Sequence, residues 1–228
     1  MTMADKKPKK ADVGEVFLRC VRLSFAEDIW RPKTFRNKDG SESIPRFSCN
    51  FLIDKKNPGK AKYLGKQMPM MEALKRAKKA ALQKKFGERD GLKKKVKPEN
   101  HCVRDGNLED WDGYEDHWFI SASNKTAPGI VDISKRPLKE SDGRPYSGCY
   151  VNAIVRLWAQ PPGTAADGSP IPLRVNGSLE AIQFLKDGER FGATPVDTDT
   201  AFDDESEEYG EEFGDDGEDD DDDDDDIL

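Results

Sequence analysis

The stretch CYVNAIVRLWAQ, residues 149–160, decides the fold. Its apolar residues recur at every second position, which is the period of a β-strand that buries one face. The apolar set is Val151, Ala153, Val155 and Leu157, and the opposite set is Tyr150, Asn152, Arg156 and Trp158, with Ile154 among them. The pattern predicts a strand with an apolar inner face and a polar, aromatic outer face.

Similar segments lie on both sides of this strand. We expect strands at residues 15–30, 45–54, 117–123, 128–133 and 173–184, separated by turn-rich loops. Within 45–54, one face is predicted to enter the core (Phe47, Cys49, Phe51 and Ile53) and the other to stay in solvent (Arg46, Ser48 and Asn50). Several short strands without an internal repeat predict an all-β core, closed or partly closed as a barrel.

One helix interrupts the strands. Residues 68–86 are good helix formers, with Pro69 near the first position and Gly87 just past the end. An apolar stripe at helical spacing consists of Met71, Leu74, Ala77, Ala81, Leu82 and Phe86. We expect this helical insertion to dock on the β core with its lysine-rich face in solvent; direct phosphate contact by that face is the alternative.

The charges of the chain are divided between its body and its C-terminal end. Residues 197–228 hold 20 of the 45 acidic residues and none of the 37 basic ones, so residues 1–196 carry 37 basic against 25 acidic residues, a net charge of +12. A run this acidic has too little apolar surface to offset its ordering entropy, and it is predicted to be disordered. The basic body is the electrostatic footprint of a protein that binds a polyanion.

These features divide the chain into a flexible basic arm (1–14), a folded domain (15–196) and a disordered acidic tail (197–228). No apolar run approaches the ~20 residues of a membrane helix, and the basic start lacks the apolar segment of a signal peptide. We therefore expect no membrane contact and a location in the cytoplasm. The four cysteines are expected to be reduced and mostly buried, because a zinc site of Cys102, Cys149, His101 and His117 matches no usual ligand spacing.

Aromatic and basic residues on strand faces and in loops suit unpaired nucleic acid, because rings stack on bases while cations neutralise phosphates. The strand at 149–160 offers Trp158, Tyr150 and Arg156, and Arg46 adds charge from a neighbouring strand. Two loops add possible clamps, namely Trp30, Lys33, Phe35 and Arg36 in one and Arg144 and Tyr146 in the other. For Trp158, packing in the core is an equally weighted alternative.

Two other classes of protein compete with this prediction. Paired carboxylates can hold Mg²⁺ and cut phosphodiesters, so the acidic cluster at 109–116 (Glu109, Asp110, Asp112, Glu115 and Asp116) allows a metal-dependent nuclease. A solvated acidic loop is favoured there, because loops alone hold a site imprecisely. The tail would also suit an acidic chaperone or interaction protein, which does not need a cationic body. We expect no enzyme activity, no catalytic residue, no metal and no cofactor.

The chain resembles a family of single-stranded DNA-binding proteins of tailed bacteriophages, long catalogued only as a domain of unknown function. The resemblance is carried by VRLSFAEDIWRPKTF (21–35), FSCNFLIDK (47–55), VRDG (103–106), FISAS with PGIVD (119–132), YSGCYVNAIVRLWA (146–159) and LEAIQFLKDGERFG (179–192). It implies an OB-fold with a five-stranded barrel and extra helices. It also implies sequence-tolerant binding of single strands in phage DNA replication, recombination or repair, in the cytoplasm of the host bacterium.

The tip of the tail resembles the tips of bacterial and phage single-strand binders, which recruit replication and repair proteins and compete with DNA for the groove. The residues predicted to bind such partners are Asp224, Asp225, Asp226, Ile227 and Leu228. The acidic run would steer toward basic pockets, and the last two side chains would fill an apolar notch. The Ile-Leu ending departs from the aromatic ending of several relatives.

Overall fold

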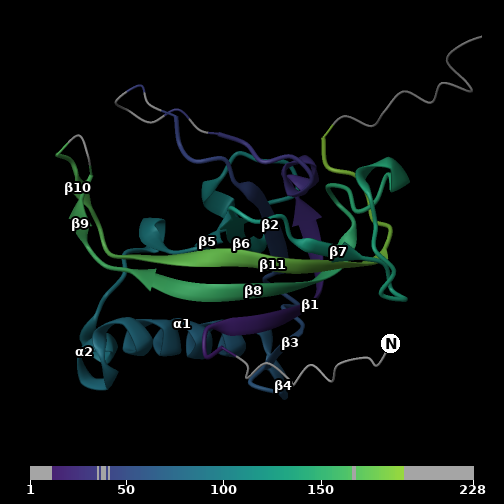
Figure 1. Ribbon diagram of the computed structural model, residues 1–228. Coiled ribbons are helices and arrows are strands. Elements are labelled where there is room, and N and C mark those ends of the chain that lie inside the picture. The colour runs from purple at the N-terminus through teal and green to yellow at the C-terminus, as the bar shows by residue number, and fades with distance from the viewer. Residues whose placement is uncertain (1–11, 35, 37–39, 41, 166–167, 193–228) are drawn as a thin grey trace, which may run out of the picture. The chain divides into compact units, whose positions relative to one another are not determined.

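The computed structural model describes residues 12–34, 36, 40, 42–165 and 168–192 of the chain. A long antiparallel pair of strands, β8 (Tyr150–Gln160) and β11 (Arg174–Lys186), runs through the middle of the fold (Figure 1). The predicted alternation in β8 is confirmed, because Val151, Ala153, Val155 and Leu157 are buried. The residues between them are less buried, and Trp158 is exposed.

Five strands pair in a continuous path. β1 (Glu15–Ser24) pairs with β2 (Phe47–Asp54), β2 with β6 (His117–Asn124), β6 with β11, β11 with β8, and β8 with β1 again. All of these contacts are antiparallel except that between β6 and β11. Short strands extend the sheet, with β5 (Val103–Asp105) beside β6 and β7 (Gly129–Val131) beside β11. The expected mostly-β core with an inserted helix is therefore present.

The first strand is shorter than predicted. β1 ends at Ser24, where the prediction extended to residue 30, and a 3₁₀ turn, η1 (Ala26–Ile29), follows it. Phe25 takes a left-handed backbone conformation, with φ of 57°, which breaks the strand. A bulge between Leu18 and Val21 also leaves Cys20 exposed, whereas the other three free cysteines are buried.

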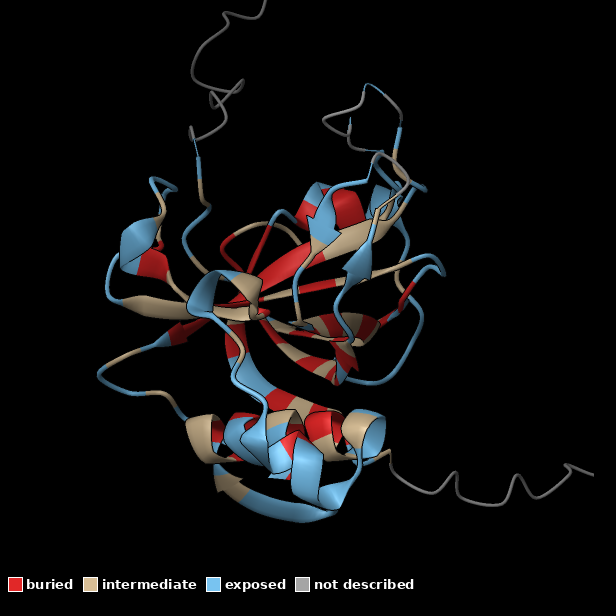
Figure 2. Cartoon of the chain, turned by 90° about the vertical axis from the view of Figure 1, so that its left-hand side faces the viewer, coloured by how far each residue is buried: buried red, intermediate tan, exposed pale blue. Residues whose placement is uncertain are grey.

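The inserted helix docks on the strands, as predicted. α1 (Met70–Phe86) begins after Pro69, two residues later than predicted, and Gly87 caps its end; α2 (Glu88–Lys93) comes directly after it. The buried residues of α1 lie toward β8 and β1, and its exposed residues face away from these strands (Figure 2). Ahead of it lies a hairpin that no sequence pattern indicated, β3 (Lys60–Tyr63) and β4 (Lys66–Pro69). Leu64 and Gly65 turn this hairpin with positive φ at both positions.

The prediction for residues 45–54 is wrong in part. Asn50 is buried rather than in solvent, because Tyr114 lies over it and accepts a hydrogen bond from its amide at 2.7 Å. Leu52 on the same face is buried with Tyr114 and Phe119 in a second small cluster. Phe47, predicted to be core, is only half-buried, because it begins the strand opposite Asn124 at the end of β6.

The remaining segments are short turns and one hairpin. The turns are η2 (Pro98–Asn100), η3 (Gly106–Leu108) and η4 (Glu140–Asp142). The hairpin of β9 (Gly163–Thr164) and β10 (Pro170–Ile171) extends beyond the ends of β8 and β11 (Figure 1). Within the described residues, no helix has the length and apolar character needed to cross a membrane. The predicted tail, 197–228, and most of the predicted arm lie outside the described residues.

Candidate nucleic-acid interface

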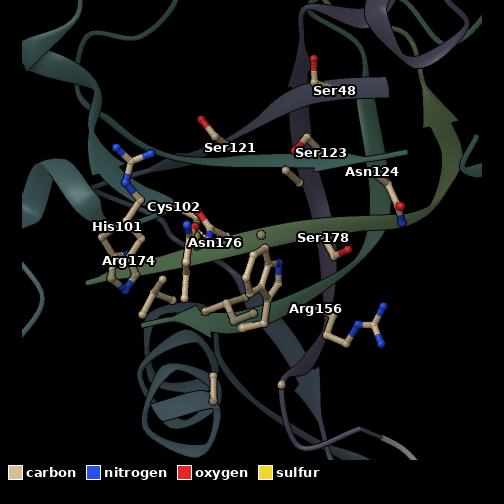
Figure 3. Close-up of a pocket in the computed structure, with 18 of the residues that line it drawn as sticks. Ser48, His101, Cys102, Ser121, Ser123, Asn124, Arg156, Arg174, Asn176 and Ser178 are labelled. Atoms are coloured by element: carbon tan, nitrogen blue, oxygen red, sulfur yellow. Dashed lines mark hydrogen bonds between the residues drawn. The ribbon is translucent and has the colours of Figure 1, made fainter. Parts of the chain in front are cut away.

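Polar side chains from four strands align across the outward face of the sheet. Gly177 of β11 pairs with Ala122 of β6 in parallel. The outward-facing residues next to Gly177 therefore lie beside those next to Ala122. Two rows result, which we call the Trp158 row (Trp158, Asn176, Ser121 and Asn50) and the Arg156 row (Arg156, Ser178, Ser123 and Ser48). Figure 3 shows the serines of both rows on neighbouring strands. Short side chains therefore form a polar floor that crosses the strands.

The two rows form the floor of an open groove of about 1410 Å³. Seven basic residues line it, namely Arg46, Lys84, Lys85, Arg104, Lys125, Arg156 and Arg174, against three acidic ones, Asp12, Asp28 and Glu99. Two of the three carboxylates are already paired, Asp12 with Lys84 at 2.8 Å and Asp28 with Lys33. A hydrogen bond from Lys84, with help from the Gly14 backbone N–H, lowers the pKa of Asp12. The groove is thus cationic.

Trp158 and Arg156 stand at the β8 edge of this groove. The Trp158 side chain is 41% exposed, so it is not part of the core. Arg156 Nη2 donates to Glu180 Oε1 at 2.6 Å across the β8–β11 pair, which fixes the guanidinium at the edge of the floor. A half-exposed indole beside a held cation offers one surface for a base and one charge for a phosphate.

The predicted loop residues near β2 are only partly brought together. Arg46 lines the groove, and its backbone exchanges two hydrogen bonds with Lys33. Lys33 is paired with Asp28, and this contact raises the pKa of the ammonium. Arg36 is exposed opposite Glu42, and Trp30 is partly buried against the core rather than free as a clamp. Phe35 lies outside the described residues.

The other three predicted residues lie away from the groove. Tyr150 shares the outward face of β8, but eight residues separate it from Trp158, or roughly 26 Å of strand. Lys186 and Arg22 lie over its ring, at 4.6 and 5.8 Å from the centroid. Arg144 pairs with Asp187 at 3.0 Å, and the Tyr146 hydroxyl donates to the same carboxylate at 3.0 Å. These side chains hold the segment after β11 in place.

Two exposed aromatic residues at the groove did not stand out in the sequence. Phe25 and Trp111 line it at the end opposite Trp158, and they are 43% and 41% exposed. Phe25 falls within the strand predicted at residues 15–30, and Trp111 lies within the acidic cluster that allows a nuclease. An aromatic residue among polar neighbours (EDWDG) was the signal that could have identified Trp111.

Three carboxylates of the acidic cluster are each held by a different partner. Glu109 pairs with Arg104 at 3.2 Å, Asp116 pairs with Lys56 at 3.0 Å, and Asp112 accepts the Gly192 N–H at 2.8 Å. Among the described residues, no three His, Cys, Asp or Glu side chains form a group that could hold a metal ion. This arrangement is that of an acidic loop tied to its surroundings by an ion pair on either side and by a backbone hydrogen bond.

His101 borders the groove and is held neutral. Burial lowers its pKa to about 4, and Lys78 acts in the same direction. Its Nδ1 accepts the Val103 N–H at 2.8 Å. Burial also raises the pKa of Cys102 to about 12 and that of Cys149 to about 11, so both thiols stay protonated.

A cation-lined groove with a polar floor and exposed rings is the arrangement found in proteins that bind single-stranded nucleic acid without sequence preference. Residues 14–213 match the family described as the ssDNA-binding protein of Enterobacter phage Enc34, and the chain belongs to this family. A protein designated p50, from Acyrthosiphon pisum secondary endosymbiont phage 1, is 32% identical over 197 residues, covering 84% of this chain and 94% of that protein.

Solved structures have the same fold. The single-stranded DNA-binding protein of bacteriophage Enc34 in complex with ssDNA matches with a TM-score of 0.59 and 24% identity, over 82% of this chain and 96% of that one. Its C-terminally truncated form matches with a TM-score of 0.59 and 22% identity, over 83% and 97% of the two chains. The expected resemblance to phage single-stranded DNA-binding proteins is confirmed.

Proposed function

We propose that this chain is a non-enzymatic protein that binds single-stranded DNA without sequence specificity. In this proposal, the five strands that pair in a continuous path form a barrel of the OB type, and DNA lies across its outward face. Trp158 stacks a base, while Arg156, Arg46 and the other groove cations neutralise phosphates. The remaining predicted residues contribute to the fold around the groove or to the DNA path beyond it.

The observation that carries the proposal is the alignment of the two polar rows beside an exposed tryptophan. The hydroxyl groups of Ser48, Ser123 and Ser178 on the floor can donate and accept, so they do not select one base. Stacking on a ring is equally indifferent to sequence, because every base has a flat face. The groove is open to solvent and cationic, as a bound single strand requires. A relative with the same fold has been solved in complex with ssDNA, which supports this use of the fold.

We further propose a role in phage DNA replication, recombination or repair inside the host cytoplasm. The acidic tail, residues 197–228, would compete with DNA for the basic body at low salt. Its last residues, Asp224 to Leu228, would recruit replication or recombination proteins. The support for both ideas is the division of charge, with 20 acidic residues in the tail and a net charge of +12 in the body.

A titration of the intrinsic tryptophan fluorescence tests the proposal. Purified full-length chain is titrated with single-stranded and duplex oligonucleotides of equal length at two salt concentrations. We expect single strands to quench the fluorescence and to bind more tightly than duplex. The logarithm of the affinity should fall with the logarithm of the salt concentration by about 0.7 per phosphate contacted. A preference for duplex, or no binding of either, would refute the proposal.

A further inference from the structure

Phe25 and Trp111 form an aromatic pair at the end of the groove opposite Trp158. Their ring centroids are 5.2 Å apart and their planes meet at 85°, an edge-to-face contact. Both side chains line the groove, and both are about two-fifths exposed. Two large apolar side chains in contact and open beside a cationic groove form an exposed patch with polar surroundings, which is typical of a binding site.

Trp111 is held from behind by rings that are themselves fully buried. It packs edge-on against Tyr114 at 5.0 Å and against Phe119 at 6.0 Å. Tyr114 is in turn fixed by its hydrogen bond from Asn50, the last member of the Trp158 row. The indole is therefore braced before any ligand arrives, and binding to it costs little side-chain entropy.

Phe25 is held in a conformation that a bulky residue rarely adopts. Its φ of 57° lies in the left-handed region, where a side chain is strained and glycine is not. Structure on both sides maintains it, since the Ala26 N–H donates to Ser147 Oγ at 3.0 Å and β1 is paired up to Ser24. Strain of this kind that neighbouring structure sustains is characteristic of functional positions.

We propose that Phe25 and Trp111 form a second base-stacking site. DNA would then run across the strands, from Trp158 on β8 to this pair beyond β2, over the polar floor. Three strand spacings of about 4.8 Å separate the β8 and β2 ends of the floor, or roughly 14 Å. Arg104 lies at this end over the Phe119 ring at 4.7 Å and lines the groove, held by its ion pair with Glu109 at 3.2 Å. The inference rests on the proposed binding of single-stranded DNA and adds the path that this DNA takes across the sheet.

Two substitutions separate stacking from folding. Phe25→Gly removes the ring at a backbone angle that suits glycine, so thermal stability should be kept. Trp111→Ala removes the second ring. Each should weaken binding of a ~16-nucleotide oligothymidylate by about 5- to 150-fold, the equivalent of ~1–3 kcal/mol of stacking, and should affect a ~4-nucleotide one less. Leu108→Ala is the matched control, because Leu108 is 82% exposed near the same loop and does not line the groove; its affinity should stay within twofold of wild type.

Fluorescence gives a second readout that a merely structural role would not change. In a Trp158→Phe background, oligonucleotide should still quench emission through Trp111, and adding Trp111→Phe should remove that quenching while the fold is kept. If wild type binds but Phe25→Gly and Trp111→Ala bind the longer oligonucleotide within twofold of it, the second site is refuted alone. If wild type binds no oligonucleotide at either salt concentration, the proposed function fails and this inference with it. Equal losses in Leu108→Ala would also refute the second site.

Discussion

The Asn50 amide donates a hydrogen bond to the Tyr114 hydroxyl at 2.7 Å, and both side chains are buried. The same asparagine accepts a hydrogen bond from Ser121 Oγ at 2.8 Å, so it joins the floor of the groove to the loop that carries Trp111. Sixty-four residues separate Asn50 from Tyr114 in the sequence. This contact fixes the end of the groove to the core.

Tyr114→Phe should destabilise the fold more than it weakens DNA binding. Removing the hydroxyl leaves the Asn50 amide buried without its acceptor, which costs about 1–3 kcal/mol. Thermal denaturation should show a melting temperature lower by several degrees. Tyr150→Phe is the control, because the hydroxyl of Tyr150 makes no hydrogen bond within the described part of the chain. Equal melting temperatures for Tyr114→Phe and wild type would contradict the assigned role of this bond.

Trp158→Ala should weaken binding of single strands by about 5- to 150-fold while changing stability little, because the indole is 41% exposed. Anisotropy of a labelled oligonucleotide measures the first effect, and thermal denaturation the second. A variant that unfolds instead would place Trp158 in the core, against its exposure in the structure.

Arg156→Gln and Glu180→Gln should act in opposite directions. Arg156→Gln removes a phosphate contact, so the salt slope of binding should become shallower by about 0.7. Glu180→Gln removes the carboxylate that accepts from Arg156 at 2.6 Å, which frees a positive charge for DNA and should raise affinity. Titrations at several salt concentrations give both slopes, and weaker binding by Glu180→Gln than by wild type would contradict the expected gain from the freed charge.

Deletion of residues 197–228 should raise the affinity for single strands, most strongly at low salt. The removed segment carries 20 acidic residues against a body of net charge +12, and their attraction is least screened when the Debye length is long. The affinities of the tail-deleted and full-length chains for a single-stranded oligonucleotide, measured at about 0.01 and 0.15 M salt, test this expectation. Equal affinities at the lower concentration would remove the competition and leave the groove unaffected.

Stability should fall as the pH drops from about 6.5 toward 4, with His101 contributing to the loss. The native imidazole, with a pKa lowered to about 4, stays neutral through this range. In the unfolded chain the same group takes up a proton near its ordinary pKa of about 6.5, so acid favours unfolding. His101→Asn keeps an acceptor for the Val103 N–H without titrating. Melting temperatures of this variant should decline less over that range; an identical decline would exclude His101 as a source.

Sequence periodicity was sufficient to predict which face of an element is buried where the apolar residues of that element are regularly spaced. The alternation in 149–160 predicted the inner and outer faces of β8, and the stripe in 68–86 predicted the docked face of α1. The sequence of β3, KAKY, does not predict a strand, because it has four residues and two of them are lysines. Pairing with β1, which is distant in the sequence, stabilises β3. Faces were therefore predictable wherever apolar spacing was regular.

The site was less predictable because it depends on register between distant strands. Trp158, Arg156 and Arg46 meet at one groove, but nothing in the spacing of residues 149–160 separates Trp158 from Tyr150, which lies on the same face and packs under Lys186. Burial of Asn50 required Tyr114 from a remote loop. The left-handed turn at Phe25 broke a strand that its own apolar neighbours favoured.

The floor of serines and asparagines has a consequence for damaged or chemically modified genomes. Side chains this short leave space above the sheet, and the hydroxyl groups of Ser48, Ser123 and Ser178 can rotate toward whichever base edge faces them. A methylated or oxidised base keeps the flat face that stacks on a ring, and the short floor side chains leave room for the added group. We expect such altered bases to be bound as readily as intact ones, which leaves their detection to other enzymes.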